Sequence, residues 1–202
     1  MPGSTSAVIL VPELELGVVV LQNSLPAIDT ADFIAQMLLK TLLEVPEPNG
    51  YVKLAREFNR LATGHINDLQ KELERNQIPG TRPRPLTFYQ GRFWNPLKNF
   101  FIEVLEPEEN QLFMKFQGMD SQSNKMEHYH HDIFSWLMPY DEVVRRYRGA
   151  QFYSAEYYLI EFRSSVQNGN LDQLLWAMDG NFTGEKVVFT KDLTESNPSV
   201  RK

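Results

Sequence analysis

The fold is decided by the stretch Phe100–Gln117, which reads FFIEVLEPEENQLFMKFQ. Apolar side chains occupy every second position before its turn, at Phe100, Ile102 and Val104, and the same alternation returns after the turn. The turn itself is Glu108-Glu109-Asn110, whose residue types favour a reversal of the chain. Because a period of two is typical of β-strands, the stretch predicts two strands joined by a turn.

Working outward, further short runs of strand-forming residues flank this pair. They are Phe88–Trp94, Met126–His131, Ile133–Leu137, Tyr157–Arg163, Leu171–Ala177 and Lys186–Thr190. About eight short strands with turn signals between them predict an antiparallel meander or small barrel over residues 86–192. Residues 193–202 are polar and are expected to form a disordered tail.

The N-terminal residues 1–45 follow a different pattern. Ala7–Val11 and Val18–Leu21 are apolar on both faces and are joined by a short connection, so they predict an antiparallel strand pair. A helix is expected over residues 30–43, capped by Asp29 or Thr30. Two strands and one helix cannot cover apolar surface on both sides of a sheet. The segment therefore resembles the incomplete end of a larger sandwich.

Residues 46–85 connect the two regions. An amphipathic helix is expected over Tyr51–Arg75, and the proline-rich stretch Ile78–Pro85 is expected to be a linker. The chain thus changes from mixed α/β to all-β at the linker, which makes its fold class α+β.

Composition excludes several function classes. Lys and Arg number 20 against 26 Asp and Glu, a net charge of -6, which argues against a nucleic-acid partner. The absence of cysteine excludes disulfides and thiol catalysis. No signal peptide, membrane span, glycine-rich phosphate loop or other cofactor motif is found, so we expect a cytoplasmic protein with no membrane partner and no cofactor.

Candidate binding residues lie in the second half. His128 and His130 alternate along one strand, so they could share a metal ion, but nothing in the spacing supplies a third ligand. The same two histidines, with Trp136, Tyr158 and Trp176, are candidates to line the barrel or a ligand cavity. Aromatic residues at period two either fill a barrel or surround a small apolar ligand.

Two further motifs have simpler interpretations. Arg145-Arg146-Tyr147-Arg148-Gly149 is a local basic patch, expected to be a solvated strand end or a salt-bridge partner of nearby acids. Ser199-Val200-Arg201-Lys202 matches a Ser-x-x-Lys pattern, but that chemistry needs a buried helix and these residues belong to the polar tail. No catalytic or metal-binding residue is assigned from the sequence.

The order of the segments resembles a known family. Val11-Pro12-Glu13 followed by Gly17-Val18-Val19-Val20-Leu21-Gln22-Asn23-Ser24 is similar to the closing strands of serine β-lactamase-like hydrolases, which include class C β-lactamases, penicillin-binding proteins, esterases and D-amino-acid peptidases. The second half resembles the lipocalin-like C-terminal domain fused to many of them, notably in fungi. The matching stretches are Tyr89-Gln90-Gly91-Arg92-Phe93-Trp94, Met126–Trp136, Tyr158–Phe162 and Leu174-Leu175-Trp176.

The departures from that family limit what the resemblance implies. The Ser-x-x-Lys nucleophile helix, the Tyr-x-Asn or Ser-x-Asn element and the Lys-Thr-Gly or His-x-Gly strand have no counterpart here. The resemblance implies the C-terminal portion of such a hydrolase, as a truncated or split product that is inactive alone. Its barrel would cover the active site or contact subunits, and its partner would be the missing N-terminal portion or a second copy. The alternative is a free-standing lipocalin-like protein that binds a small apolar ligand.

Overall fold

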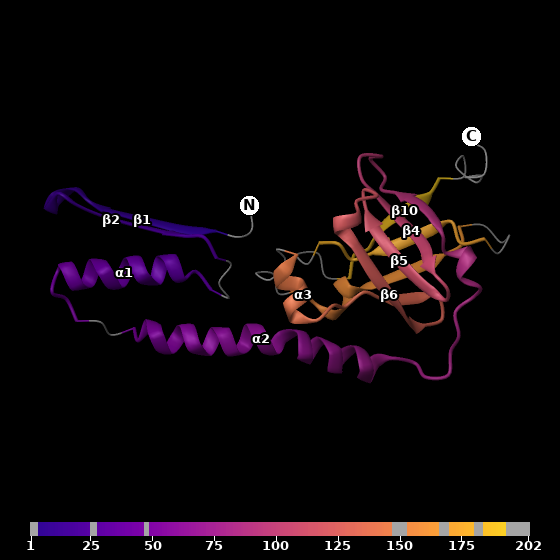
Figure 1. The fold of residues 1–202 in the computed structure, drawn as a ribbon, viewed down its shortest axis with the longest axis horizontal. Coiled ribbons are helices and arrows are strands. Elements are labelled where there is room, and N and C mark those ends of the chain that lie inside the picture. The colour runs from indigo at the N-terminus through magenta and orange to yellow at the C-terminus, as the bar shows by residue number, and fades with distance from the viewer. Residues whose placement is uncertain are drawn as a thin grey trace. The chain divides into compact units, whose positions relative to one another are not determined.

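The computed structural model describes residues 4–24, 28–46, 49–146, 153–165, 170–179 and 184–192. The chain divides into two compact units, residues 1–69 with 138–152 and residues 70–137 with 153–202. The first unit holds a two-stranded sheet with helices, and the second holds a closed barrel (Figure 1). The predicted α+β architecture of strand pair, helices and antiparallel barrel is therefore confirmed.

In the first unit, a helix covers one face of a β-hairpin. Strands β1 (Thr5–Val11) and β2 (Leu16–Gln22) pair antiparallel, with Val8 opposite Val19. Helix α1 (Thr30–Leu42) packs along the hairpin, as Figure 1 shows. Asp29 caps this helix by accepting a hydrogen bond from the Asp32 backbone N–H at 3.1 Å, which satisfies one of the free donors of the first turn.

Helix α2 (Tyr51–Asn76) begins against α1 through a single aromatic residue. The Tyr51 ring lies 5.0 Å from the ring of Phe33, and its hydroxyl donates to the Gln36 side chain. Lys40 approaches the same hydroxyl at 3.3 Å. None of the helices described in the structure combines the length and apolar character that a membrane span requires.

Helix α3 (Tyr140–Arg145) was not predicted from the sequence. The Glu142 carboxylate accepts hydrogen bonds from Arg145 at 2.8 Å and from Arg146 at 3.4 Å. These two arginines of the basic patch are therefore salt-bridge partners on a helix, whereas residues 147–149 lie outside the described residues. Six residues are too few for helical periodicity to be recognised in a sequence.

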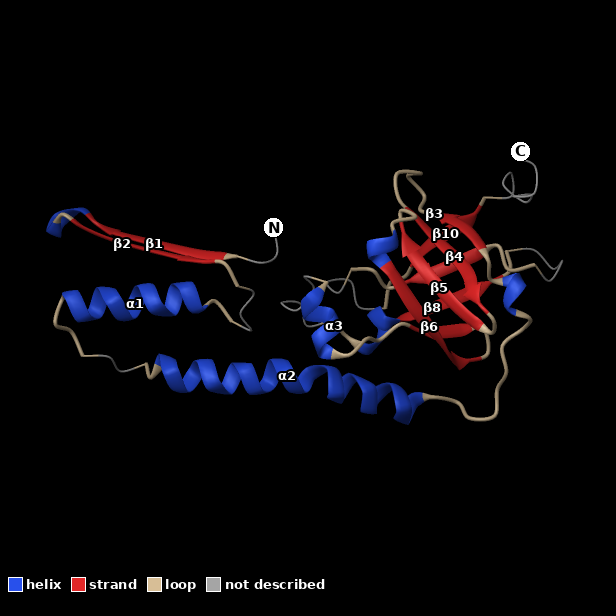
Figure 2. Cartoon of the chain, in the orientation of Figure 1, coloured by secondary structure: helices blue, strands red, loops and turns tan. Residues whose placement is uncertain are grey.

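The second unit is an antiparallel barrel in which each strand pairs with its neighbours in sequence, and the last strand pairs with the first. Figure 2 shows the strands wrapping around a common interior. The eight strands are β3 (Gly91–Trp94), β4 (Phe101–Glu108), β5 (Gln111–Phe116), β6 (Ser123–His130), β7 (Ile133–Ser135), β8 (Leu159–Arg163), β9 (Gln173–Trp176) and β10 (Val187–Lys191). Closure comes from Lys191 pairing opposite Phe93.

The alternation of the Phe100–Gln117 stretch sets the inward face of the barrel. Ile102 and Val104 of β4, and Leu112 and Met114 of β5, are all at most 2% exposed. Their neighbours along each strand are more exposed, because successive side chains of a strand point to opposite faces. The predicted pattern and the predicted barrel are both confirmed here.

Several strand predictions were too long at their start, and two of them begin within a 3-10 turn. Leu86–Phe88 forms a short 3-10 turn after Pro85, so β3 begins only at Gly91. Ala155–Tyr158 forms a similar turn before β8. In both places the side chains are those of a strand, but the backbone closes a turn, in which Phe88 N–H donates to the Pro85 carbonyl oxygen and Tyr157 N–H to the Ser154 carbonyl oxygen. The predicted tail, residues 193–202, lies outside the described residues.

Candidate functional site

The barrel interior is filled by aromatic side chains. Trp136 and Trp176 are 2% and 4% exposed, and both indole N–H groups donate to the Tyr157 carbonyl oxygen, at 3.1 and 2.7 Å. Phe116 stacks on Trp176 with 5.3 Å between ring centroids, and buried Tyr158 lies 5.4 Å from the Trp136 ring. The three aromatic residues proposed as barrel lining thus pack among themselves and their neighbours.

The two candidate histidines lie at the end of β6, next to the turn into β7. The pairing register shifts between His128 and His130, which interrupts the simple alternation that would place them on one face. The His128 Nε2 atom lies 3.0 Å from the His131 carbonyl oxygen. Among the described residues, no group of three or more His, Cys, Asp or Glu side chains is arranged to hold a metal ion.

His130 is set in a less polar environment than His128. Its Nδ1 atom is buried and makes no hydrogen bond to the described residues. Burial lowers the pKa of His130 below its ordinary value, and the neighbouring His131 and His128 lower it further. The His130 ring packs beside Tyr129, with 4.7 Å between the ring centroids. A ligand role for the five candidate residues stays a prediction.

The end of α2 and the following segment are hydrogen-bonded to the barrel. The Tyr129 hydroxyl donates to the Leu73 carbonyl oxygen at 2.8 Å, and Gln77 donates to the Tyr129 carbonyl oxygen at 2.8 Å. The His131 backbone N–H donates to the Thr81 hydroxyl at 3.2 Å. The domain boundary at residue 86 stays a prediction, and these contacts favour a barrel unit that starts nearer to residue 70.

A second anchor joins the former linker to the turn between β6 and β7. The fully buried Tyr89 donates a hydrogen bond to Asp132 at 2.6 Å and accepts one from the Arg84 backbone N–H at 2.9 Å. The Arg84 side chain pairs with the same carboxylate at 3.2 Å. Burial raises the pKa of the Tyr89 phenol above its ordinary value, and the hydrogen bond to Asp132 raises it further.

This anchor predicts a response to alkaline pH. Because the pKa of Tyr89 is raised in the folded state, the phenol ionises at lower pH in the unfolded chain. Its contribution to the free energy of unfolding is therefore fully present below about pH 10 and is lost as the pH rises further. We expect Tyr89→Phe to lose about 1–3 kcal/mol of unfolding free energy at neutral pH. It should also flatten the decline above pH 10 in urea unfolding curves. Tyr140→Phe, outside the barrel, is the control, and equal slopes for both variants would contradict the prediction.

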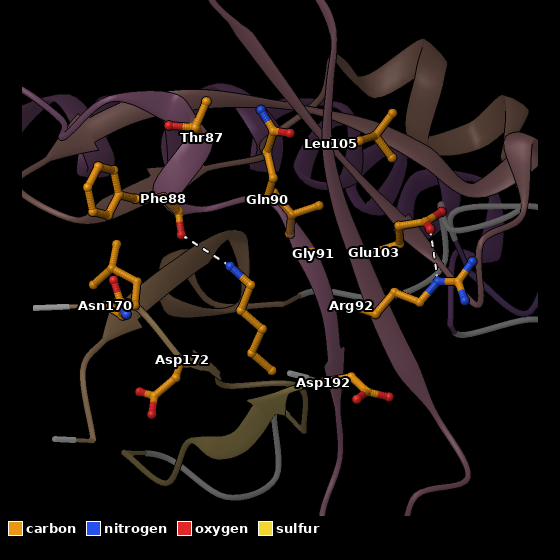
Figure 3. A pocket seen from close by; sticks show the side chains of 13 residues that line it. Thr87, Phe88, Gln90, Gly91, Arg92, Glu103, Leu105, Asn170, Asp172 and Asp192 are labelled. Carbon is orange, nitrogen blue, oxygen red and sulfur yellow. Dashed lines mark hydrogen bonds and ion pairs between the residues drawn. The ribbon is translucent and has the colours of Figure 1, made fainter. Parts of the chain in front are cut away.

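A pocket lies at one end of the barrel, where β3 and β9 begin and β10 ends, beside the middle of β4. Figure 3 shows its lining side chains, and its volume is about 660 Å³. The residues that line it are Thr87, Phe88, Gln90, Gly91, Arg92, Glu103, Val104, Leu105, Asn170, Leu171, Asp172, Lys191 and Asp192. The five candidate residues of the sequence analysis are not among them.

Lys191 crosses this pocket over Gly91, which has no side chain. A Cβ at position 91 would lie 2.6 Å from Lys191 Cε, so the end of the lysine would have to move if position 91 carried a side chain. Gly91 also has a φ of +135°, which L-residues with side chains rarely adopt. The Lys191 Nζ atom lies 3.5 Å from the Phe88 carbonyl oxygen and 5.6 Å from the centre of the Phe93 ring.

The charges around Lys191 are already engaged with other groups. Arg92 donates to Glu103 at 2.9 Å on the neighbouring strand. Asp172 accepts hydrogen bonds from the Ser165 backbone N–H, at 2.7 Å, and from its hydroxyl. Burial would raise the pKa of Asp172, but the hydrogen bonds from Ser165 lower it below its ordinary value. Burial lowers the pKa of Lys191, and the charge of Asp172 opposes that effect only in part.

Sequence reasoning missed this pocket, although one signal for it exists. Lys191 lies two positions after the buried Phe189, so a period of two places it on the inward face of β10. The predicted run stopped one residue earlier, at Thr190. An inward-facing lysine at a strand end, opposite a strand that begins with glycine, is the pattern that identifies the pocket.

These observations define the class of protein: a small antiparallel β-barrel, with a packed aromatic interior and a pocket at one end. Residues 75–191 match the family described as Domain of unknown function (DUF3471), and the chain belongs to this family. The domain is known as a C-terminal domain of β-lactamase-family proteins. No curated protein and no solved structure matches the chain.

Proposed function

We propose that this chain is the C-terminal accessory portion of a β-lactamase-related serine hydrolase. Its β1–β2 hairpin and α1 would complete the sheet of the catalytic domain, and its barrel would cover the active-site side or contact a neighbouring subunit. Membership of a family found at the C-terminus of β-lactamase-family proteins supports this proposal. The segment order Val-Pro-Glu, apolar strand and helix supports it independently.

The observation that carries the proposal is the outer face of the β1–β2 hairpin. Val8, Leu10, Val19 and Leu21 are 60–79% exposed, whereas the other face carries α1, in which Ala31 and Ala35 are fully buried. Sheets with an apolar face on both sides occur with layers on both sides. A further layer from the catalytic domain would cover this face and pair with the strand edges.

The accessory role follows from what the described residues can and cannot do chemically. Serine acylation needs a nucleophile, a base and oxyanion donors in one site. In the described part of the chain, the lining of the barrel-end pocket contains no serine. The buried polar residues there contain none either, so no serine is placed beside a lysine or tyrosine base at these positions. A cytoplasmic location remains part of this proposal.

We expect the chain alone to show no turnover of nitrocefin, p-nitrophenyl esters or D-amino-acid amides above the buffer rate. The physical reason is the missing acylation machinery, which the catalytic domain would supply. Mass spectrometry after incubation with a fluorophosphonate provides the direct measurement, and a related β-lactamase is the positive control. Stoichiometric labelling of one serine would overturn this expectation.

The decisive test of the proposal is the coding sequence that precedes the codon for Met1. An in-frame segment encoding Ser-x-x-Lys, Tyr-x-Asn and a Lys-Thr-Gly or His-x-Gly strand would support it. Expression of that longer product should yield fluorophosphonate labelling that the chain alone lacks. A transcript that begins at this chain, together with a monomeric product, would contradict the proposal.

A second candidate function is supported by the barrel-end pocket. A cavity of about 660 Å³ is in the range of small-molecule sites. The barrel would then bind a small, largely apolar ligand, either as a free-standing lipocalin-like protein or within the hydrolase. His128, His130, Trp136, Tyr158 and Trp176 do not line this pocket, so a ligand role for them would require a different site in the barrel.

A further inference from the structure

We propose that the barrel-end pocket binds a small organic carboxylate, with its carboxylate on the Lys191 ammonium group and its apolar part on the pocket rim. This inference rests on the second candidate function, ligand binding by the barrel, and names the class of ligand and the residue that selects it. It is independent of the hydrolase proposal.

Lys191 passes over Gly91 on the inward face of β10. A Cβ at position 91 would lie 2.6 Å from Lys191 Cε, so the flexible end of the lysine would have to shift to make room for one. The opposing strand therefore combines a glycine at an unusual φ with the space that the lysine stem occupies. The Lys191 Nζ atom ends 3.5 Å from the carbonyl oxygen of Phe88, a residue that Figure 3 labels in the pocket.

The Lys191 ammonium group can donate more hydrogen bonds than it makes to the described residues. It carries three N–H donors, and its one hydrogen bond to the described residues is the 3.5 Å contact with the Phe88 carbonyl oxygen. In the part of the chain that the structure describes, no ion pair is formed by Lys191, because Asp172 is turned toward Ser165. A half-buried cation in this state gains most from an anionic ligand.

Among anions, the pocket favours one with a single negative charge over one with two, because its own carboxylates repel both and repel the dianion more. Arg92 is paired with Glu103, so Lys191 is the cation left for a ligand. Asp172 and Asp192 also line the pocket, and they would repel a dianion such as phosphate more strongly than a monoanion. A carboxylate satisfies the ammonium group without this excess of charge.

The pocket also offers apolar surface that the hydrocarbon part of the ligand would contact. Phe88 is 39% exposed at the rim, and Val104, Leu105 and Leu171 contribute apolar lining. Because the barrel interior is packed with aromatic rings, the ligand would lie in the barrel-end pocket rather than pass down the barrel axis. A short-chain or aromatic acid fits these dimensions.

The test compares octanoate with octanamide, two probes of matched shape that differ in charge, by isothermal titration of the full chain. Octanoate should bind one-to-one and octanamide at least tenfold more weakly. Lys191→Met, which keeps the stem and removes the charge, should weaken octanoate binding at least tenfold and leave octanamide unchanged. Lys125→Met removes a surface lysine paired with Glu127 and should change neither.

The possible outcomes separate the two proposals. Equal binding of both probes, unaffected by Lys191→Met, would overturn the carboxylate inference and leave ligand binding by the barrel standing. No heat or spectral change with either probe at millimolar concentration would overturn both. Tighter binding of inorganic phosphate than of octanoate would also overturn the choice of a carboxylate. Thermal melting of each variant verifies that the barrel is folded during the titrations.

Discussion

Placing lysines at Val19 and Leu21 is expected to convert a self-associating chain into a monomer. Both side chains lie on the uncovered face of the β1–β2 hairpin and are 60% and 79% exposed. Burying such a face is worth roughly 25 cal/mol per Å² of apolar surface, so several hundred Å² would drive association. Two charges on that face would have to be desolvated in any dimer, which opposes it.

Sedimentation velocity at tens of micromolar measures this effect directly. The wild-type chain should sediment as dimers or larger species, and Val19→Lys with Leu21→Lys as a monomer. Ser6→Lys adds a charge to the same face without removing apolar surface, and we expect it to reduce association much less. Deleting residues 1–45 should also give a more soluble protein. A monomeric wild-type chain would mean that this face is covered within the protein, which favours the free-standing barrel.

The second large effect concerns the paired tryptophans of the barrel interior. Trp176→Ala is expected to lower the free energy of unfolding of the barrel by about 3–5 kcal/mol, because it removes a large buried ring and leaves a cavity. It also removes one of the two indole donors to the Tyr157 carbonyl oxygen and the stacking on Phe116. Trp176→Phe keeps most of the volume and should lose a smaller amount.

Urea unfolding followed by near-ultraviolet circular dichroism provides the measurement. Trp94→Ala is the matched control, because Trp94 lies on the outward face of β3, is only half-buried and packs its ring against that of Phe101. We expect it to lose less than half as much free energy as Trp176→Ala. Similar losses for the two variants would show that the interior contacts described here do not dominate the stability of the barrel.

The sequence alone determined the local elements where periodicity is strong. Alternation in the Phe100–Gln117 stretch predicted β4, the turn and β5, because the inward side chains of these two strands are apolar and fill the barrel interior. The cap at Asp29 and the apolar positions that follow it predicted α1 to within a residue. These elements depend on residues that lie within a few positions of one another, so the local sequence is enough to predict them.

Only the tertiary structure decided how the barrel closes and where its pocket lies. The pairing of Lys191 with Phe93 joins residues almost a hundred positions apart, and no local pattern specifies that register. Arg84, in a segment that the sequence predicted to be a linker, is likewise held by its hydrogen bond to Tyr89 and its ion pair with Asp132. Gly91 and Lys191 belong to one site because the lysine side chain occupies the space that a side chain at position 91 would fill. Such complementarity exists only after distant strands meet, which is why residue spacing could not predict it.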